Sequence, residues 1–140
     1  LIGMFCFLLC ALLAKLFLEA INYVEHYGLV RERGKPVSMR HSWNSNHFLS
    51  SLYLFNVTRH SDHHRAPNLK FWELDPFYES APILPYGYLG MLYLILILPP
   101  LYHRILTKKL IDWDLNYASE QERKLANVQI RNSGITYLYN

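Results

Sequence analysis

The sequence has few of the residues that mark several common protein classes. Its 140 residues include only two cysteines and six glycines, and it contains no internal repeat or low-complexity tract. Cys6 and Cys10 lie within an apolar run, where a reduced and inert pair is expected rather than a disulfide or a metal site. The glycines form no nucleotide-binding loop. These absences give no support to a secreted disulfide scaffold, a repeat protein or a nucleotide-binding enzyme.

Charge is also absent from the first part of the chain. Every residue from Leu1 to Ala14 is apolar or glycine. With Lys15 and Glu19 admitted, the apolar pattern continues to Ile21 and reaches transmembrane length, about 20 residues. The run has no basic n-region and no small-residue cleavage site, so a signal peptide is not indicated. We predict one transmembrane helix over residues 1–27.

Polar residues gather at the end of this predicted helix. Glu19, Asn22 and His26 follow i, i+3, i+7 spacing and therefore share one helical face. Ionisable groups at membrane depth are costly and usually face a protein interior or a functional site. Gly28 is expected to end the helix. The helix is therefore predicted to carry polar side chains to the membrane boundary.

The rest of the chain alternates basic and apolar segments. Residues 28–88 are mostly polar and basic, and their proline-containing end, residues 75–88, is predicted to be an ordered loop. Residues 89–102 are apolar but short for a span, and residues 103–140 are again basic and polar. Under the positive-inside rule both basic segments belong on the cytoplasmic side, so residues 89–102 are predicted to be re-entrant or interfacial. Membrane topology explains the net charge of +3 better than nucleic-acid binding does.

Two further helices are predicted in the polar segments. Residues 47–57 are compatible with a helix that leads into the histidine-rich stretch described below. Ser119 and Glu122 form a capping box, which predicts a helix over residues 120–131 with Gly134 as its stop. The expected fold class is therefore all-α, as part of an integral-membrane helical bundle.

The chain is expected to be a piece of a larger protein. It begins without methionine and inside the apolar run. Its histidine-rich stretch also supplies too few ligands for the metal site that the sequence suggests. We interpret residues 1–140 as the C-terminal part of a single membrane domain, with a membrane helix followed by a cytoplasmic region, a second apolar segment and a cytoplasmic tail.

Residues 59–64, with the sequence Arg-His-Ser-Asp-His-His, are the most informative stretch of the chain. On a helix, His60, His63 and His64 fall within roughly one third of the circumference. Three imidazoles on one face cannot be buried unless each finds a polar partner. Neutral imidazole suits Fe, Zn, Cu or Ni, so a shared transition metal explains the triplet better than a polar surface turn does. His26, at the end of the membrane helix, is the fourth ligand candidate.

The remaining histidines and two carboxylates are expected to play lesser parts. His41 and His47 are spaced six apart with no second histidine beside either, so a supporting or structural role is expected rather than metal ligation. His103 follows a double proline and is interpreted as a membrane-interface residue. Glu25 and Asp62 adjoin ligand candidates and could accept the second ring N–H of a histidine. Solvated carboxylates are the alternative for both.

Four segments of the chain together resemble the C-terminal half of the membrane alkane monooxygenases, which are integral-membrane, non-haem di-iron hydroxylases. The segments are NYVEHYGL at 22–29, HSWNSNH at 41–47, RHSDHH at 59–64 and LPYGY at 84–88. The resemblance covers about residues 1–106, with a weaker likeness over 113–134. A His-x-x-His-His box also occurs in membrane desaturases, so the resemblance depends on all four segments occurring in the family order.

The resemblance implies a centre of two iron ions held almost wholly by histidines. Carried onto this chain, the implied ligands are His26, His60, His63 and His64, and two further histidine boxes of the family have no counterpart here. The chain is therefore expected to be inactive alone. Thr58 stands where the family often has Gln, a departure that bears on subfamily and substrate rather than on the metal. The implied location is the bacterial inner membrane, multi-pass, with the metal site on the cytoplasmic side.

The implied reaction is hydroxylation of the terminal methyl group of an alkane by O2, with electrons from a rubredoxin or a ferredoxin. An alkane C–H bond offers no polar handle, so a strong oxidant is required. The basic segment 31–70 could dock an acidic electron carrier, although positive-inside bias explains its charge equally well. Three alternatives stay open: a methyl-aromatic (xylene-type) monooxygenase, a fatty acyl desaturase, and a non-catalytic membrane metal-binding protein.

Overall fold

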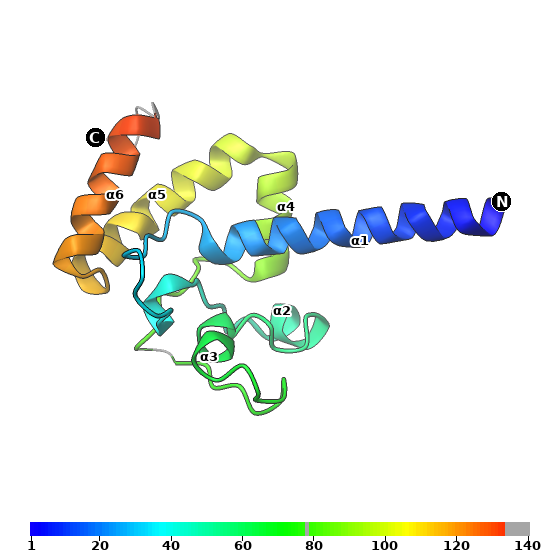
Figure 1. The fold of residues 1–140 in the computed structure, drawn as a ribbon, viewed down its shortest axis with the longest axis horizontal. Coiled ribbons are helices and arrows are strands. Elements are labelled where there is room, and N and C mark those ends of the chain that lie inside the picture. The colour runs from blue at the N-terminus through cyan, green and yellow to red at the C-terminus, as the bar shows by residue number, and fades with distance from the viewer. Residues whose placement is uncertain (78, 134–140) are drawn as a thin grey trace.

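The computed structural model describes residues 1–77 and 79–133. These residues form helices joined by loops (Figure 1), which confirms the predicted all-α class. Within the described ranges the strand-like pairing is limited to an isolated parallel bridge between Asn44 and Ile83. The elements in chain order are α1 (Ile2–His26), the 3-10 turn η1 (Met39–His41), α2 (Phe48–Tyr53), α3 (His60–Arg65), α4 (Tyr88–Ile97), α5 (Pro99–Asn116) and α6 (Glu120–Ser133).

Helix α1 projects from the rest of the molecule as a long rod (Figure 1). Its 25 residues include an 18-residue window with a mean hydropathy of 2.3, and none of that window is buried. At 1.5 Å per residue the helix is roughly 37 Å long, which exceeds the ~30 Å hydrocarbon core of a bilayer. By length and composition α1 is a candidate membrane span, as the sequence predicted.

The end of α1 is set by a glycine that also allows close packing. The helix stops at His26, and Gly28 has a φ of +73°, in the left-handed region that favours glycine. A Cβ atom at Gly28 would lie 2.6 Å from both terminal methyl carbons of Leu110. The predicted stop is therefore confirmed, and the missing side chain lets α5 approach the end of α1.

The second apolar segment, residues 89–102, is divided between two helices. Helix α4 covers ten residues, and α5 begins at Pro99. Proline suits the first turn of a helix because its missing N–H is not needed there, so the double proline starts α5 instead of interrupting one long element. At about 15 Å, α4 is half the thickness of a bilayer core. It packs against both α1 and α5.

Helix α5 was not predicted from the sequence. Only three of its 18 residues are buried, and these are Tyr102, Leu106 and Trp113. Their spacing of four and seven places them on one face. Ile105 and Leu110 flank this face, so a helical periodicity is present in the sequence. The double proline and the many basic residues of this segment favoured a polar tail over a helix.

The core ties the end of α1 to the segment that follows it. Its largest fully buried side chains are Trp43, Trp113, Tyr88 and Tyr102. The Trp43 indole N–H donates to the Tyr27 carbonyl at 2.9 Å, and its backbone N–H donates to the Glu25 carbonyl at 2.8 Å. The Trp113 indole N–H donates to the Arg40 carbonyl at 2.7 Å. The last turn of α1 is therefore held in a fixed position against residues 40–43.

Helix α2 is shorter than the helix expected over 47–57. It ends at Tyr53, and the residues that follow leave the helical region, with φ values of +49° at Phe55 and +56° at Asn56. Several large apolar side chains of this stretch are exposed, including Phe48 and Phe55. The chain then enters α3 through Arg59, so the predicted order of a short helix before the histidine box is confirmed.

Helix α6 confirms the predicted helix near the end of the chain. The Ser119 backbone N–H donates to Glu122 Oε2 at 2.8 Å, and the Glu122 backbone N–H donates to Ser119 Oγ at 3.3 Å. These two bonds are the reciprocal pair of a capping box. The predicted stop, Gly134, lies outside the described residues.

Candidate metal centre

Helix α3 carries the histidine box, and its buried face fixes its position. Ser61 and Asp62 are fully buried, whereas the three histidines lie at or near the surface. The Ser61 backbone N–H donates to Asn44 Oδ1 at 2.8 Å, and its hydroxyl donates to the Met39 carbonyl at 2.8 Å. The start of α3 is therefore anchored to residues 39–44, so its histidine rings have a defined orientation.

Asn44 supports the site, and the sequence analysis did not single it out. Its backbone N–H donates to the Pro82 carbonyl and its carbonyl accepts from the Leu84 N–H, both at 2.8 Å. Its side chain accepts from Ser61, as described above. Asn44 thus connects α3 to the loop at residues 75–88, which the sequence predicted to be ordered. A buried polar residue needs such partners, so an asparagine inside a motif shared with the family was the available signal.

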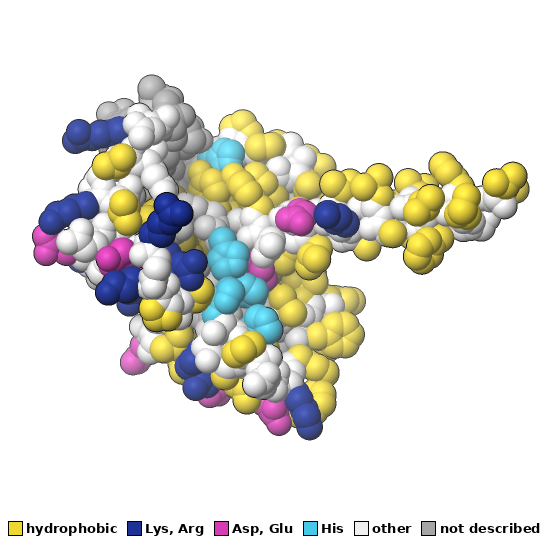
Figure 2. All heavy atoms as spheres, in the orientation of Figure 1, with side chains coloured by type: hydrophobic (Ala, Val, Ile, Leu, Met, Phe, Trp, Pro, Cys, Tyr) yellow, Lys and Arg dark blue, Asp and Glu magenta, His cyan; other side chains and the backbone are white. Residues whose placement is uncertain are grey.

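Three histidine rings from two distant segments converge. His26 Nε2 lies 3.2 Å from His60 Nε2 and 3.4 Å from His64 Nε2. One nitrogen from each of the three rings falls within 4.8 Å of the others. Figure 2 shows histidine side chains grouped at the surface just beyond the polar end of α1. Two of the three predicted box histidines therefore lie against the histidine that ends the membrane helix.

The tautomer of His26 follows from its second ring nitrogen. His26 Nδ1 lies 3.0 Å from the His41 carbonyl oxygen, which can only accept, so Nδ1 carries the proton. Its Nε2 is then unprotonated and points toward His60 and His64. A carbonyl that fixes the tautomer of a ligating histidine is a common feature of metal sites. The residue that supports His26 is thus His41, through its backbone.

Glu25 lies beside this cluster and is incompletely paired. Its side chain is buried, and Oε2 lies 3.4 Å from His60 Nε2. Within the described structure Glu25 Oε1 has no hydrogen-bond partner, and the same is true of His60 Nδ1. Glu25 is therefore not the solvated carboxylate that was the alternative at this position. Two unpaired buried polar atoms beside three converging rings indicate a site whose partners are incomplete in the isolated chain.

Burial favours the neutral form of two rings of the box, those of His60 and His64. Burial, reinforced by the neighbouring His64, His26 and His63 rings, lowers the pKa of His60 to about 3. Burial, together with the neighbouring His26 and His63 rings and Arg31, lowers the pKa of His64 to about 4. Neutral imidazole keeps a nitrogen lone pair, which is the form that binds metal ions.

The separations between the nitrogen atoms suit a metal ion. Imidazole nitrogen binds an ion such as zinc at about 2.0–2.1 Å, so two nitrogens on one ion at roughly 90–110° are about 3.0–3.4 Å apart. The two measured separations are 3.2 Å and 3.4 Å. Hydrogen bonding between rings would satisfy the contacts less well, because the single lone pair of His26 Nε2 accepts from one ring only. The three residues therefore fit an imidazole-bound metal.

Asp62 is directed away from the histidine rings. It is fully buried, and its Oδ1 accepts from Arg65 Nε at 2.7 Å while its Oδ2 accepts from the Asp75 backbone N–H at 2.8 Å. Both oxygens are thus occupied by partners other than the histidine ring N–H expected from the sequence. Asp62 is neither solvated nor paired with a ring, and it holds α3 to the loop that follows.

His41 lies in a separate, fully paired network. Its Nε2 lies 2.7 Å from Glu122 Oε1, and its Nδ1 accepts from the Ser38 backbone N–H at 2.9 Å. Arg40 Nε donates to Glu122 Oε2 at 2.9 Å. The sequence analysis placed Glu122 in a helix cap and missed this second role. The structural role expected for His41 matches this geometry.

The other three histidines stay outside the group of converging nitrogens. The His63 ring is exposed, with its centroid 5.7 Å from that of His60. His47 is exposed at the start of α2. His103 stacks on Tyr27, with centroids 5.2 Å apart, and its Nε2 lies 3.1 Å from the Tyr23 hydroxyl. His103 therefore contacts the polar end of the membrane helix.

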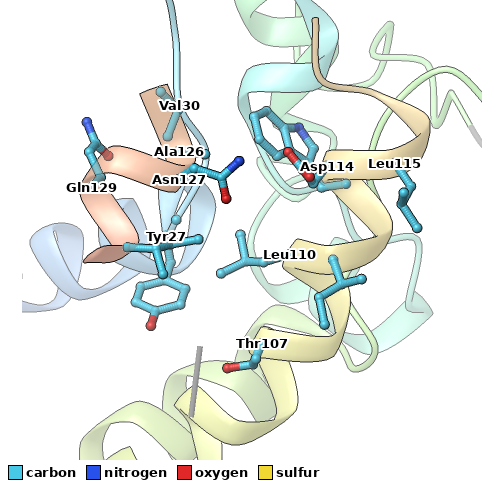
Figure 3. A pocket seen from close by; sticks show the side chains of 13 residues that line it. Tyr27, Val30, Thr107, Leu110, Asp114, Leu115, Ala126, Asn127 and Gln129 are labelled. Carbon is cyan, nitrogen blue, oxygen red and sulfur yellow. The ribbon is translucent and has the colours of Figure 1, made fainter. Parts of the chain in front are cut away.

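A separate pocket of about 360 Å³ lies where the end of α1 meets α5 and α6 (Figure 3). Tyr27, Leu110 and Asn127 are among the side chains around it (Figure 3). None of the described residues that line this pocket is a histidine. It is a largely apolar pocket that is separate from the histidine cluster.

Comparison with known proteins adds an independent observation. Residues 1–95 match the fatty acid desaturase family. The chain belongs to that family. Among its relatives it is 41% identical over 125 residues to an alkane 1-monooxygenase 2 of Pseudomonas aeruginosa and 42% identical over 112 residues to an alkane 1-monooxygenase 2 of Alcanivorax borkumensis. It is also 36% identical over 124 residues to a xylene/toluene monooxygenase hydroxylase component of Pseudomonas putida.

These matches cover most of this chain but only part of each relative. They cover 86%, 76% and 88% of this chain but 32%, 29% and 33% of the respective relatives. The chain thus spans about a third of the length of these relatives. The resemblance to alkane monooxygenases, seen first in the sequence motifs, is confirmed.

Proposed function

We propose that the protein containing this chain is a membrane non-haem di-iron monooxygenase that hydroxylates the terminal methyl group of an alkane. The observation that carries the proposal is the convergence of His26, His60 and His64 nitrogens at the polar end of an apolar helix. Similarity to alkane 1-monooxygenases supports the substrate class. Bound iron would supply the oxidising power that an unactivated C–H bond requires.

The residues of this chain would hold and orient the metal. His26, locked in one tautomer by the His41 carbonyl, would bind through Nε2 together with His60 and His64. His63 is retained as a ligand on the strength of the family resemblance, since the same helix turn carries it. The two further histidine boxes of the family would complete a two-iron centre, so residues 1–140 are proposed to be inactive alone.

The position of the cluster suits a lipid-soluble substrate. An alkane partitions into the bilayer, and the cluster lies at the end of the apolar helix, where a bilayer meets water. The substrate would arrive from the membrane while protons and electrons arrive from the aqueous side. We place the protein in the bacterial inner membrane as a multi-pass protein with the cluster on the cytoplasmic side, in agreement with the basic loops.

Electrons would come from a rubredoxin or a ferredoxin. Lys and Arg side chains lie close to the histidine group in Figure 2. Arg31, Arg33 and Lys35 are exposed, and Arg31 is near enough to His64 to contribute to lowering the pKa of that ring. A cationic surface beside the metal would favour docking of an acidic carrier.

Variants of the intact protein test the ligand assignment. Replacing His60, His63 or His64 with Ala should abolish hydroxylation of octane and lower the iron content. His103→Ala should retain both, because this ring stacks on Tyr27 outside the cluster. Equal loss of iron and activity in all four variants would contradict the assignment.

The methyl-aromatic monooxygenase is the second candidate, since one relative is a xylene/toluene monooxygenase component. Parallel assays of the intact protein with octane and with a xylene separate the two activities. Formation of an alkene from a long-chain acyl substrate would instead favour a desaturase. Full iron loading without oxidation of any of these substrates would favour a non-catalytic metal-binding role.

A further inference from the structure

A second pocket lies on the opposite side of α5 from the pocket of Figure 3. It has a volume of about 550 Å³ and is lined by the first four turns of α5, as far as Asp112, and by the loop that precedes α4. Leu101 and Ile105 give it an apolar wall, Tyr86 adds a half-exposed aromatic ring, and Arg104 and Lys108 add positive charge. A volume of roughly 300–1,000 Å³ is typical of pockets that take small molecules.

Contacts between α5 and α1 indicate where this pocket would lie relative to a membrane. His103, the neighbour of Arg104, lies 3.1 Å from the Tyr23 hydroxyl through its Nε2 and stacks on Tyr27. Both tyrosines belong to the polar end of the long apolar helix. If α1 crosses a bilayer, the second turn of α5 is at the membrane boundary, where phospholipid phosphates lie.

The chain balances only part of the positive charge of the pocket, through Asp112 in its lining. Lys109 lies 3.8 Å from Asp112, but Arg104 and Lys108 form no ion pair within the described residues. Arg104 and Lys108 are four residues apart on one helix, where like charges repel. A bound anion between them would remove that repulsion.

We propose that this pocket binds the headgroup of an anionic phospholipid. The phosphate would lie between Arg104 and Lys108, and the first methylene groups of the acyl chains would contact Leu101 and Ile105. Ile97 and Leu98, at the end of α4 and just before α5, are also exposed. A concave site with an adjoining apolar wall suits a lipid better than a convex acidic protein. The inference rests on α1 being a membrane helix and not on the metal chemistry.

The experiment measures lipid retention by the intact protein. Wild type and variants are purified in detergent with equal amounts of phosphatidylglycerol and phosphatidylcholine, and bound lipid is counted by native mass spectrometry. Wild type should retain phosphatidylglycerol in preference to phosphatidylcholine. The double variant Arg104→Gln/Lys108→Gln should retain roughly 30-fold less phosphatidylglycerol, since each basic group near a membrane surface contributes about fivefold.

A matched control removes two charges elsewhere. Lys124 and Arg131 are exposed on α6, outside the pocket, so Lys124→Gln/Arg131→Gln should change retention by less than about twofold. If the double variant fails to bind iron or to fold, the single Lys108→Gln variant replaces it, with a loss of about fivefold expected. Arg104→Lys/Lys108→Arg should keep phosphatidylglycerol, because it preserves the charge.

Several results would overturn the proposal. Wild type could retain both lipids equally, or the control variant could lose as much phosphatidylglycerol as the double variant. Inorganic phosphate alone could displace the lipid from wild type. The double variant could also keep its phosphatidylglycerol and lose binding of an acidic electron carrier. The last result would assign the pocket to protein docking. Phosphatidylglycerol retention by a wild-type protein that oxidises no alkane would contradict only the proposed function.

Discussion

The molecule contains two networks with buried or half-buried histidines, one around Glu122 with a single histidine and one around His60 with three, and they differ in how their polar atoms are satisfied. Around Glu122, both carboxylate oxygens and both nitrogens of His41 have partners between 2.7 Å and 3.2 Å, including Arg40 and Ser119. Around His60, three rings face one another and leave His60 Nδ1 and Glu25 Oε1 unpaired.

This difference separates a structural histidine from a binding one. A histidine with a carboxylate on one nitrogen and a backbone group on the other has no capacity left for a ligand. The cluster at α3 has nitrogen lone pairs that the chain itself does not use, and burial lowers the pKa of His60 and His64. Because open polar groups are costly in a buried position, the cluster indicates a missing partner whereas the Glu122 network indicates a complete one.

The largest expected effect separates the two groups by their metal content. In the intact protein, His60→Ala should lower bound iron by about tenfold or more, because it removes one of three converging nitrogens. His41→Ala should keep most of the iron but lower the unfolding temperature, since it breaks the Glu122 network. Iron analysis and thermal unfolding of both variants check this, and the opposite pattern would invert our assignment.

The next effect concerns the completeness of the Glu122 network. Glu122→Ala should destabilise the protein by about 3 kcal/mol, because it leaves the buried His41 ring and the Ser119 amide without their acceptor. Glu120 provides the matched control on the same helix, since its pair with Lys124 is exposed. Glu120→Ala should cost less than about 1 kcal/mol. Denaturant unfolding measures both, and equal losses would mean that the network is not specially stabilising.

Low pH should remove the stability that the Glu122 network contributes. Burial opposes ionisation of Glu122, but hydrogen bonds from Arg40, the Ser119 amide and His41 outweigh it and lower the pKa of this carboxyl to about 2. The folded pKa is below the unfolded one, so this contribution is present above about pH 4.5 and is lost as the pH falls toward 2. It amounts to roughly 3 kcal/mol. Unfolding of the iron-free protein between pH 5 and 2 should show this loss, and Glu122→Gln should lack it.

The smallest effect tests the close packing of α5 against the end of α1, which lies between the two networks. Gly28→Ala and Gly34→Ala both place a side chain at positive φ, with values of +73° and +83°. At Gly34 nothing lies within 4 Å of the new Cβ, so only backbone strain of about 1 kcal/mol is expected. At Gly28 the Leu110 side chain must also move, which adds about 1 kcal/mol. Thermal unfolding compares the variants, and equal losses would argue against close packing of α5 on α1.

Some features of the fold could be predicted because they depend on neighbouring residues. The apolar run of α1, the capping box of α6 and the positive φ of Gly28 each have local causes. Helix α5 was missed although Tyr102, Leu106 and Trp113 recur at helical spacing, because the double proline suggested an interruption and the basic residues suggested a polar tail. At a helix start, however, proline has the favourable backbone geometry.

The candidate site was predicted only in part for the same reason. The spacing of His60, His63 and His64 indicated a shared face, the place of His26 at the end of the apolar helix made it the fourth candidate, and the family resemblance implied the same four ligands. Which nitrogens converge depends on pairs 34 and 38 residues apart, and His63 stays outside that group. The partner of His41 is 81 residues away, in a helix known from the sequence only for its cap.

The sequence by itself determined that this chain has a membrane-length apolar helix and a histidine box whose chemistry suits a metal. Composition and helical periodicity are local properties, so they can be read before folding. Only the tertiary structure decided that His26 meets His60 and His64 while His41 pairs with Glu122. Both arrangements depend on the hydrogen bonds and packing that return the chain to the end of α1, and these join residues that no local pattern connects.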